Sequence, residues 1–156
     1  MTDLNPVVII AGPTASGKSA LALDVAGEFS GTVINADSMQ VYEDLSVLTV
    51  RPGKAEKAAV PHRLFGVLPA SEGCSAGRWL KMAAGEIKAA WVDGRLPVMV
   101  GGTGLYLKVL TEGLAEIPDI ADEFNEQAND LYDRLGGEAF KTELAKLDPV
   151  AAISLP

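Results

Sequence analysis

An apolar run that leads directly into a glycine-rich loop constrains the fold of this chain more than any other feature. Residues 7–11 read Val-Val-Ile-Ile-Ala, a run typical of a parallel strand that is covered on both faces. Residues 12–19 match the phosphate-binding pattern G-x-x-x-x-G-K-[ST], and residues 20–26 are apolar and helix-forming. This strand, loop and helix predict an α/β fold of the P-loop type, with three layers (α/β/α) around a parallel sheet.

The residue types of the loop explain how it would hold an anion. Gly12 and Gly17 let the backbone turn its N–H groups toward phosphate oxygens, and the helix that starts near Lys18 adds the positive end of its dipole. Lys18 would contact the terminal phosphate oxygens, and the Ser19 hydroxyl would ligate Mg²⁺. The predicted diphosphate- or nucleotide-binding residues are therefore Gly12, Pro13, Thr14, Ala15, Ser16, Gly17, Lys18 and Ser19.

Composition narrows the class of protein. The chain has 156 residues, 48% of them hydrophobic, which is enough for one globular domain with a core. The net charge of -8 argues against a broad basic surface for nucleic acid, and the densest positive segment, residues 51–57 with His62 and Arg63, is most simply a solvated loop. The single cysteine, Cys74, excludes an internal disulfide, and the N-terminal apolar run is too short for a signal peptide or membrane span. These features predict a cytoplasmic protein.

Periodicity predicts the remaining elements. Strands are expected at residues 32–36 and 96–100, with a short strand or extended connection at 64–68. Helices are expected at 78–92, where Trp79 and Trp91 would pack in the core and Arg95 would face the negative helix end, and at 105–110. After a connector at 117–120, two amphipathic helices at 122–135 and 138–147 form a small helical insertion toward the C-terminus. The expected division is residues 1–118 and 119–156.

Polar residues follow two of these strands, at the edge where parallel sheets bind ligands. Asp37 follows the strand at 32–36, and it could bind Mg²⁺ through water, accept a proton from a nucleophile, or cap the next turn. Spacing alone does not choose among these roles. Thr103 lies in the glycine-rich turn after the strand at 96–100, either as a hydroxyl at the site or as a helix cap.

An ordered series of motifs carries a resemblance to a known family. The segments are GPTASGKS at 12–19, DSMQVY at 37–42, PHRL at 61–64, GGTGLY at 101–106 and DPV at 148–150. Together they resemble the motif series of the tRNA dimethylallyltransferases, also called tRNA isopentenyltransferases, over almost the whole chain. The phosphate loop alone is shared with many kinases, whereas its combination with the second and fourth segments is specific.

The resemblance implies an enzyme that transfers a dimethylallyl group from dimethylallyl diphosphate to N6 of the adenosine next to the tRNA anticodon, with Mg²⁺ and release of diphosphate. It implies that Asp37, Lys18 and Thr103 are catalytic, with Asp37 as the base and Thr103 at the target nucleotide. Residues Thr14 to Ser19 would contact the diphosphate, and Asp37, Ser38, Met39, Gln40 and Thr103 would contact the tRNA. The helices after Ile120 resemble the start of the family's insertion domain for the anticodon stem-loop. We expect a monomer without membrane contact.

Two other functions are consistent with the phosphate loop. A small-molecule kinase would hold ATP on the loop, although residues 104–120 lack an Arg-rich lid, and a non-catalytic nucleotide switch is the third possibility. The chain also departs from the family pattern, since Asn125 lies where many members have Arg, and Arg51-Pro52 takes the place of a Lys-Pro pair. Because the family continues well past residue 156, the chain is expected to be an incomplete version.

Overall fold

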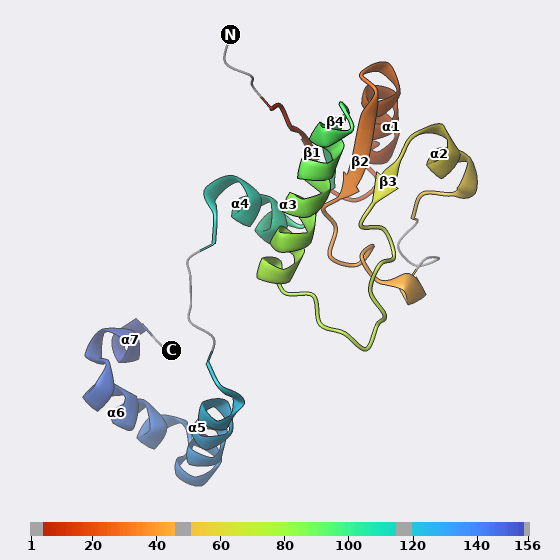
Figure 1. The fold of residues 1–156 in the computed structure, drawn as a ribbon. Helices are drawn as coiled ribbons and strands as arrows, with labels where there is room; N and C mark the ends of the chain where they lie inside the picture. Colours follow the sequence, from red (N-terminus) through yellow and green to blue (C-terminus); the bar gives the residue numbers. More distant parts are fainter. Residues whose placement is uncertain (1–4, 46–50, 115–119, 155–156) are drawn as a thin grey trace. The chain divides into compact units, whose positions relative to one another are not determined.

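Four parallel strands form the sheet of the first compact unit, Met1–Leu114, in the computed structural model of the protein (Figure 1). The structure describes residues 5–45, 51–114 and 120–154. The strands are β1 (Val8–Ala11), β2 (Gly31–Asn35), β3 (His62–Arg63) and β4 (Leu96–Gly101), in the order β1-β4-β2-β3. The predicted parallel sheet is therefore confirmed.

The register brings the carboxyl ends of three strands to one edge. Ala11 pairs with Gly101, and Asn35 pairs with Val100. The loop after β1, the turn after β2 and the glycine-rich turn after β4 consequently start side by side. This is the edge at which the sequence predicts a ligand.

Helices cover both faces of the sheet and produce the predicted α/β/α layers. Helix α1 (Lys18–Glu28) packs on one face, where its Ala22 and Ala26 join Val33, Val60, Val98 and Val100 in a buried cluster. Helices α3 (Ala76–Val92) and α4 (Gly104–Glu112) cover the other face, where the buried cluster is Ile34, Ala36, Leu64, Trp79, Ala83, Ile87, Met99, Tyr106 and Val109. Successive residues of β2 and β4 alternate between the two clusters, as the pleat of a strand requires.

Two aromatic residues fix α3 to the sheet, as predicted from their packing. The Trp79 ring is fully buried and stacks on Tyr106 with ring centroids 4.4 Å apart, and its Nε1 donates a hydrogen bond of 3.0 Å to the Asn35 carbonyl. Trp91 is half-buried, and its Nε1 donates to the Pro6 carbonyl. Ser75 caps the start of this helix, because its Oγ accepts the Arg78 N–H.

Some predictions from the sequence were wrong. Strand β1 is not covered on both faces, because it is the edge strand of the described sheet and Ile9 is 39% exposed. Residues 54–59 form helix α2 (Lys54–Ala59) rather than a solvated loop. Arg95 does not face the helix end, since its guanidinium donates to Thr32 Oγ1 and to the Gly31 carbonyl of β2.

Residues 64–68 were predicted only as a short strand or extended connection. The paired strand β3 lies before it, at His62–Arg63, and Leu64 has a φ of +62° that turns the chain out of the sheet. Beyond Leu64 the chain runs beside the residues that follow β2, where Leu68 forms an isolated bridge with Tyr42. A short 3-10 turn, η1 (Glu43–Leu45), follows that bridge.

The second compact unit, Ala115–Pro156, is helical in its described part. Helices α5 (Asp122–Leu135) and α6 (Gly137–Leu147) are separated by Gly136, whose φ is +74°. The Tyr132 and Phe140 rings meet edge-on across this turn. The short helix α7 (Pro149–Ser154) was not predicted, and the Asp148 carboxylate starts it by accepting the Ala151 N–H. The predicted connector at 117–120 lies almost wholly outside the described residues, as do positions 47–50.

None of the helices in the described part of the chain combines the length and hydropathy that a membrane span requires.

Candidate functional site

The loop after β1 forms a turn that opens toward the start of α1. Gly17 has a φ of +84°, a conformation that glycine adopts without strain, and Ala15 also takes a positive φ of +61°. Because α1 begins at Lys18, its first backbone N–H groups have no acceptor within the helix and face the loop. The Lys18 ammonium donates a hydrogen bond to the Pro13 carbonyl of the same loop. The turn therefore has the geometry expected of an anion-binding nest, with a lysine at its rim.

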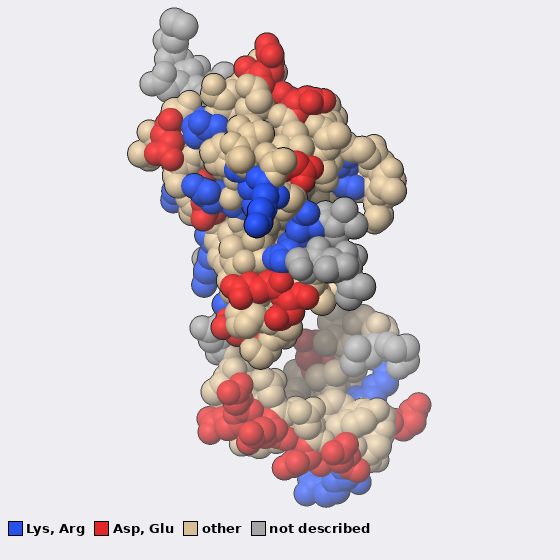
Figure 2. All heavy atoms as spheres, turned by 90° about the vertical axis from the view of Figure 1, so that its right-hand side faces the viewer, with Lys and Arg blue, Asp and Glu red and all other residues tan. Residues whose placement is uncertain are grey.

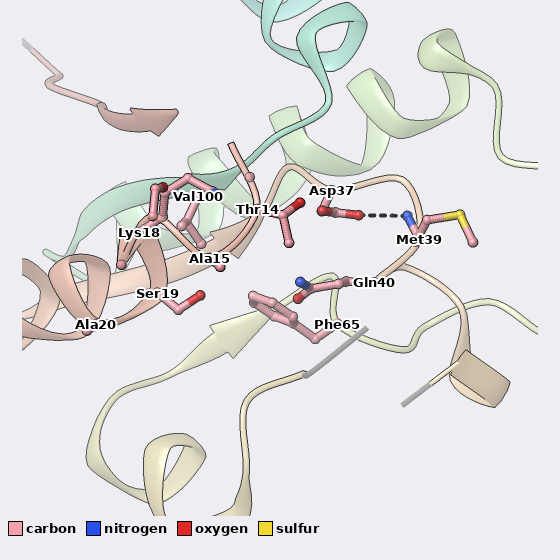
Figure 3. A pocket seen from close by; sticks show the side chains of 13 residues that line it. Thr14, Ala15, Lys18, Ser19, Ala20, Asp37, Met39, Gln40, Phe65 and Val100 are labelled. Carbon is pink, nitrogen blue, oxygen red and sulfur yellow. Dashed lines mark hydrogen bonds between the residues drawn. The ribbon is translucent and has the colours of Figure 1, made fainter. Parts of the chain in front are cut away.

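The loop and Asp37 face a common cavity of about 480 Å³ (Figure 3). The loop side of the cavity is lined by Thr14, Ala15, Ser16, Gly17, Lys18, Ser19 and Ala20. The other lining residues are Asp37, Met39, Gln40, Phe65, Val100 and Gly101. In Figure 3 the Phe65 ring lies between Ser19 and Gln40, so it gives this part of the cavity an apolar surface. The predicted loop residues Gly12 and Pro13 do not line the cavity.

Asp37 makes a local turn and also lines the cavity. Its Oδ1 accepts the Met39 N–H at 2.9 Å, as the dashed line in Figure 3 shows. Its Oδ2 receives no hydrogen bond from any residue in the described ranges. The turn-capping role is thus present, and it leaves one carboxylate oxygen available on the cavity side.

Thr103 does not cap the helix with its side chain, although it occupies the N-cap position of α4. Its Oγ1 instead accepts the Ser38 N–H at 2.9 Å, and its hydroxyl lies 3.3 Å from Ser38 Oγ. The Thr103 N–H donates to the Ala36 carbonyl. Neither Thr103 nor Ser38 lines the cavity, so Thr103 acts on it by holding the turn that contains Asp37. The capping interpretation of its hydroxyl was wrong because that hydroxyl finds a partner across the sheet edge.

Asn35 is a buried polar residue that the sequence reasoning did not single out. Its side chain is fully buried at the end of β2 and makes hydrogen bonds with both backbone groups of Asp37 and with the Leu64 carbonyl. The available signal was a lone amide in the run Val33-Ile34-Asn35-Ala36, since a buried polar side chain needs partners. Phe65 was also missed as a cavity residue, and its ring lies edge-on to His62.

A close approach of two backbones sets the position of the Asp37 turn. A Cβ atom added to Gly101 would lie 2.2 Å from the Ala36 carbonyl carbon and oxygen and 2.7 Å from the Asp37 nitrogen. Only glycine fits between the end of β4 and this peptide. Gly101, at the end of β4, therefore allows the end of β2 to approach β4 closely.

Two tyrosines support the wall behind the turn. The Cys74 N–H donates to the Tyr42 hydroxyl, and the Tyr106 hydroxyl donates to the Cys74 carbonyl. Burial raises the pKa of Tyr106, which keeps the phenol protonated as a donor. Both tyrosines come from the motif segments, and their partner Cys74 lies in the loop before α3.

The oxygen donors at the cavity suit a magnesium ion. The Ser19 hydroxyl and the Asp37 carboxylate line the same cavity, and Mg²⁺ in phosphate sites takes one or two protein oxygens with the remainder from phosphate and water. Among the described residues no group of three or more His, Cys, Asp or Glu side chains is placed to hold a metal. The donor set therefore fits a metal held jointly with a phosphate ligand.

The surface charge is mixed on the first unit. In Figure 2 the Lys and Arg side chains of this unit are interspersed with Asp and Glu, and acidic side chains predominate on the visible face of the second unit. Hydrogen bonds tie Arg51 to the Tyr42 and Glu43 carbonyls and Arg78 to Glu72, so part of the positive charge serves the fold. No broad basic surface appears on these faces.

Comparison with known proteins gives matches to two family models. The model described as IPP transferase matches residues 40–156, and the model described as isopentenyl transferase matches residues 5–65. A tRNA dimethylallyltransferase of Rhodospirillum centenum is 56% identical over 155 residues, which are 99% of this chain and 49% of that protein. The chain spans about half the length of the curated relatives it matches.

Solved structures show the same fold. A eukaryotic dimethylallyltransferase acting on tRNA is 30% identical with a TM-score of 0.79, and the match covers 96% of this chain and 37% of that chain. The full-length tRNA isopentenylpyrophosphate transferase of Bacillus halodurans is 32% identical with a TM-score of 0.70, and the match covers 98% of this chain and 51% of that chain. These structures establish the fold of the chain.

Proposed function

Because this chain belongs to the IPP transferase family, we propose that it transfers a dimethylallyl group from dimethylallyl diphosphate to N6 of the adenosine next to the anticodon in tRNA, with release of diphosphate. One observation carries the proposal: the glycine-rich loop and the Asp37 carboxylate line the same cavity, which Phe65 also lines. The relatives that suggest the reaction are about twice as long as this chain.

The loop would hold the diphosphate. Backbone N–H groups at the start of α1 would bind its oxygens, and Lys18 would neutralise the charge that develops as the allylic carbon–oxygen bond breaks. An ammonium group has three donors, so Lys18 can keep its hydrogen bond to the Pro13 carbonyl and still bind a phosphate oxygen. Mg²⁺, held at the Ser19 hydroxyl, would supply further positive charge to the leaving group. Phe65 and Val100 would exclude water around the five-carbon group.

Asp37 would act as the general base. The exocyclic amine of adenine is a weak nucleophile, and its N–C bond to the dimethylallyl group forms as the C–O bond to diphosphate breaks. The amine proton would pass to Asp37, whose Oδ2 receives no hydrogen bond from a described residue while Oδ1 is held by the Met39 N–H. Base catalysis of this kind contributes about 10²- to 10⁴-fold.

The tRNA contacts belong to the same proposal. Asp37, Ser38, Met39 and Gln40 would face the target nucleotide, and Thr103 would orient them through Ser38. An adenosine in an anticodon loop must be unstacked before its N6 can enter such a cavity. We further propose that residues 119–156 begin a tRNA-binding insertion in which Asn125 replaces a phosphate-binding Arg. A monomeric state and a cytoplasmic location complete this proposal.

The kinase alternative is not retained. Both family models that match this chain describe transfer of an isopentenyl-type group, and together they span residues 5–156. The glycine-rich turn at 101–106 belongs to the motif series of the transferases, and the kinase hypothesis assigns it no role. ATP turnover is kept as an outcome of the test.

Single-turnover transfer from labelled dimethylallyl diphosphate to unmodified tRNA tests the proposal. We expect label in the tRNA with the wild-type chain and at least about 10²-fold slower transfer with Asp37→Asn, while diphosphate affinity stays close to wild type. Asp24→Asn is the matched control, because Asp24 is exposed on α1 and does not line the cavity. Transfer by D37N at the wild-type rate would remove Asp37 as the base. ATP turnover without labelled tRNA would overturn the assigned reaction.

A further inference from the structure

We propose that Asn35 is a positioning residue that fixes the catalytic carboxylate of Asp37 through hydrogen bonds to both the N–H and the carbonyl of the Asp37 backbone. This inference rests on the proposed function, in which Asp37 is the base. Asn35 does not line the cavity and would touch neither substrate. It would act entirely through the residue two positions further along the chain.

The contacts of the Asn35 side chain carry the inference. The side chain is 0% exposed. Its Oδ1 accepts the Asp37 N–H at 2.9 Å, and its Nδ2 donates to the Asp37 carbonyl at 2.9 Å and to the Leu64 carbonyl at 3.0 Å. A neutral amide has two N–H donors, and both donors of Asn35 are used in these hydrogen bonds.

These contacts replace a strand partner that Asp37 lacks. The register between β2 and β4 runs as far as Asn35 and Val100, and the last bond of this edge joins the Ala36 N–H to the Val100 carbonyl. Beyond that point the chain leaves the sheet, and the Asn35 amide supplies the donor and acceptor that a neighbouring strand would otherwise offer. The Asp37 turn is thereby held in the same rigid frame as the sheet.

Asn35 is itself anchored from the other face of the sheet. Trp79 donates its indole N–H to the Asn35 carbonyl at 3.0 Å, and the ring is buried against Tyr106. On the other side, Leu64 has a φ of +62°, and its carbonyl accepts the hydrogen bond from the Asn35 amide. A residue kept in this sparsely populated region needs support from its surroundings. The amide therefore joins the ends of β2 and β3 to the base.

Two other hydrogen bonds of the turn involve the N–H groups of later residues. Thr103 Oγ1 accepts the Ser38 N–H, and Asp37 Oδ1 accepts the Met39 N–H. The hydrogen bonds that the described residues make to the Asp37 backbone both come from Asn35. Loss of the amide would let the carboxylate shift relative to the loop, and a misplacement of about 1 Å costs roughly 10²-fold in rate.

Asn35→Leu is the main test, because leucine has a similar branched shape and no polar atom. We expect kcat for dimethylallyl transfer to fall by about 10²-fold, with little change in KM for dimethylallyl diphosphate. Thr32→Val is the matched control, since Thr32 is the other buried polar residue of β2 and holds Arg95 at the opposite end of the strand. T32V is expected to keep the wild-type kcat. Equal loss of kcat in both variants would indicate a general effect on the fold and overturn the proposal.

A double-mutant cycle separates positioning from other effects. If Asn35 acts only through Asp37, then N35L slows the wild type but adds no further loss in an Asp37→Asn background. Independent, multiplied losses would overturn the proposal. Should N35L fail to fold, Asn35→Ser keeps one hydrogen bond and is expected to lower kcat by about tenfold.

Hydrogen exchange at the Asp37 amide gives a readout that needs no activity. We expect this amide to be protected in the wild type and in T32V and to exchange faster in N35L or N35S. Absence of transfer by the wild-type chain would refute the proposed function, while the exchange result would still decide whether Asn35 fixes the turn. Wild-type transfer that drops in D37N but not in N35L would refute the Asn35 inference alone.

Discussion

Gly101→Ala is the sharpest probe of how the sheet positions Asp37. The added methyl group would lie 2.2 Å from the Ala36 carbonyl group, whereas ordinary contacts begin at 3.4 Å. The obstructing atoms are backbone atoms, so a side-chain rotation cannot relieve the contact. The Ala36–Asp37 peptide or the end of β4 must therefore move by about 1 Å.

The size of this movement sets two expected effects. Inserting a methyl group into a packed site costs roughly 1–3 kcal/mol of unfolding free energy. A shift of about 1 Å in the base lowers the single-turnover transfer rate by about 10²-fold. Urea denaturation measures the first effect, and transfer of labelled dimethylallyl groups to tRNA measures the second.

Gly104→Ala is the matched control for this substitution. Gly104 lies three residues further along the same turn, at the first position of α4, and a Cβ there has no neighbouring atom within 4 Å. Alanine in a helix is favoured over glycine by up to about 1 kcal/mol, so G104A is expected to equal or exceed wild-type stability and to keep its rate. Wild-type stability and rate in G101A would refute the claim that this glycine sets the position of Asp37.

Three further outcomes are expected. Lys18→Ala should weaken inorganic diphosphate binding as well as slow transfer, as isothermal titration with and without Mg²⁺ would measure, because it removes the cation at the rim of the nest. Burial lowers the pKa of His62 below its usual 6.5, so the unfolded chain binds a proton there more readily than the folded chain does. The free energy of unfolding should therefore fall as pH drops below about 6.5, and it should fall less in His62→Gln. Urea midpoints compared between pH 5 and pH 8 would measure this difference. Phe65→Ala should join the cavity at the loop to a neighbouring one of about 130 Å³ that Phe65 also lines, and should therefore raise the affinity for a geranyl thiolodiphosphate relative to its dimethylallyl counterpart.

The elements that follow from periodicity and turn chemistry were predictable from the sequence. The phosphate loop, the strands of the buried sheet centre and α5 lie where the apolar patterns place them. Helix α2 was missed because its six residues carry no apolar stripe. The exposure of β1 was missed because an apolar run records the tendency to be buried, whereas strand order decides which strand lies at an edge.

The candidate site was predictable only in part, for a similar physical reason. The sequence identified Asp37 and the loop, because local motifs determine both. It did not identify Asn35, and it left the Thr103 hydroxyl between two roles, since the partners of these side chains lie far along the chain. Thr103 and Ser38 are 65 residues apart, and Asn35 and Leu64 are 29 residues apart. Such pairs exist only after the sheet has assembled.

The strand order has a consequence for synthesis of the protein. β1 and β2 are consecutive along the chain, yet they do not pair with each other, because β4 lies between them. Until β4 (Leu96–Gly101) has left the ribosome, the earlier strands β1 and β2 lack the neighbour that joins them, and the nascent chain exposes apolar strand faces. The anion loop can adopt its turn early from local contacts, whereas the Asp37 carboxylate gains its fixed place only when β4 inserts. Ribosome-bound chains are therefore expected to depend on chaperones until that insertion.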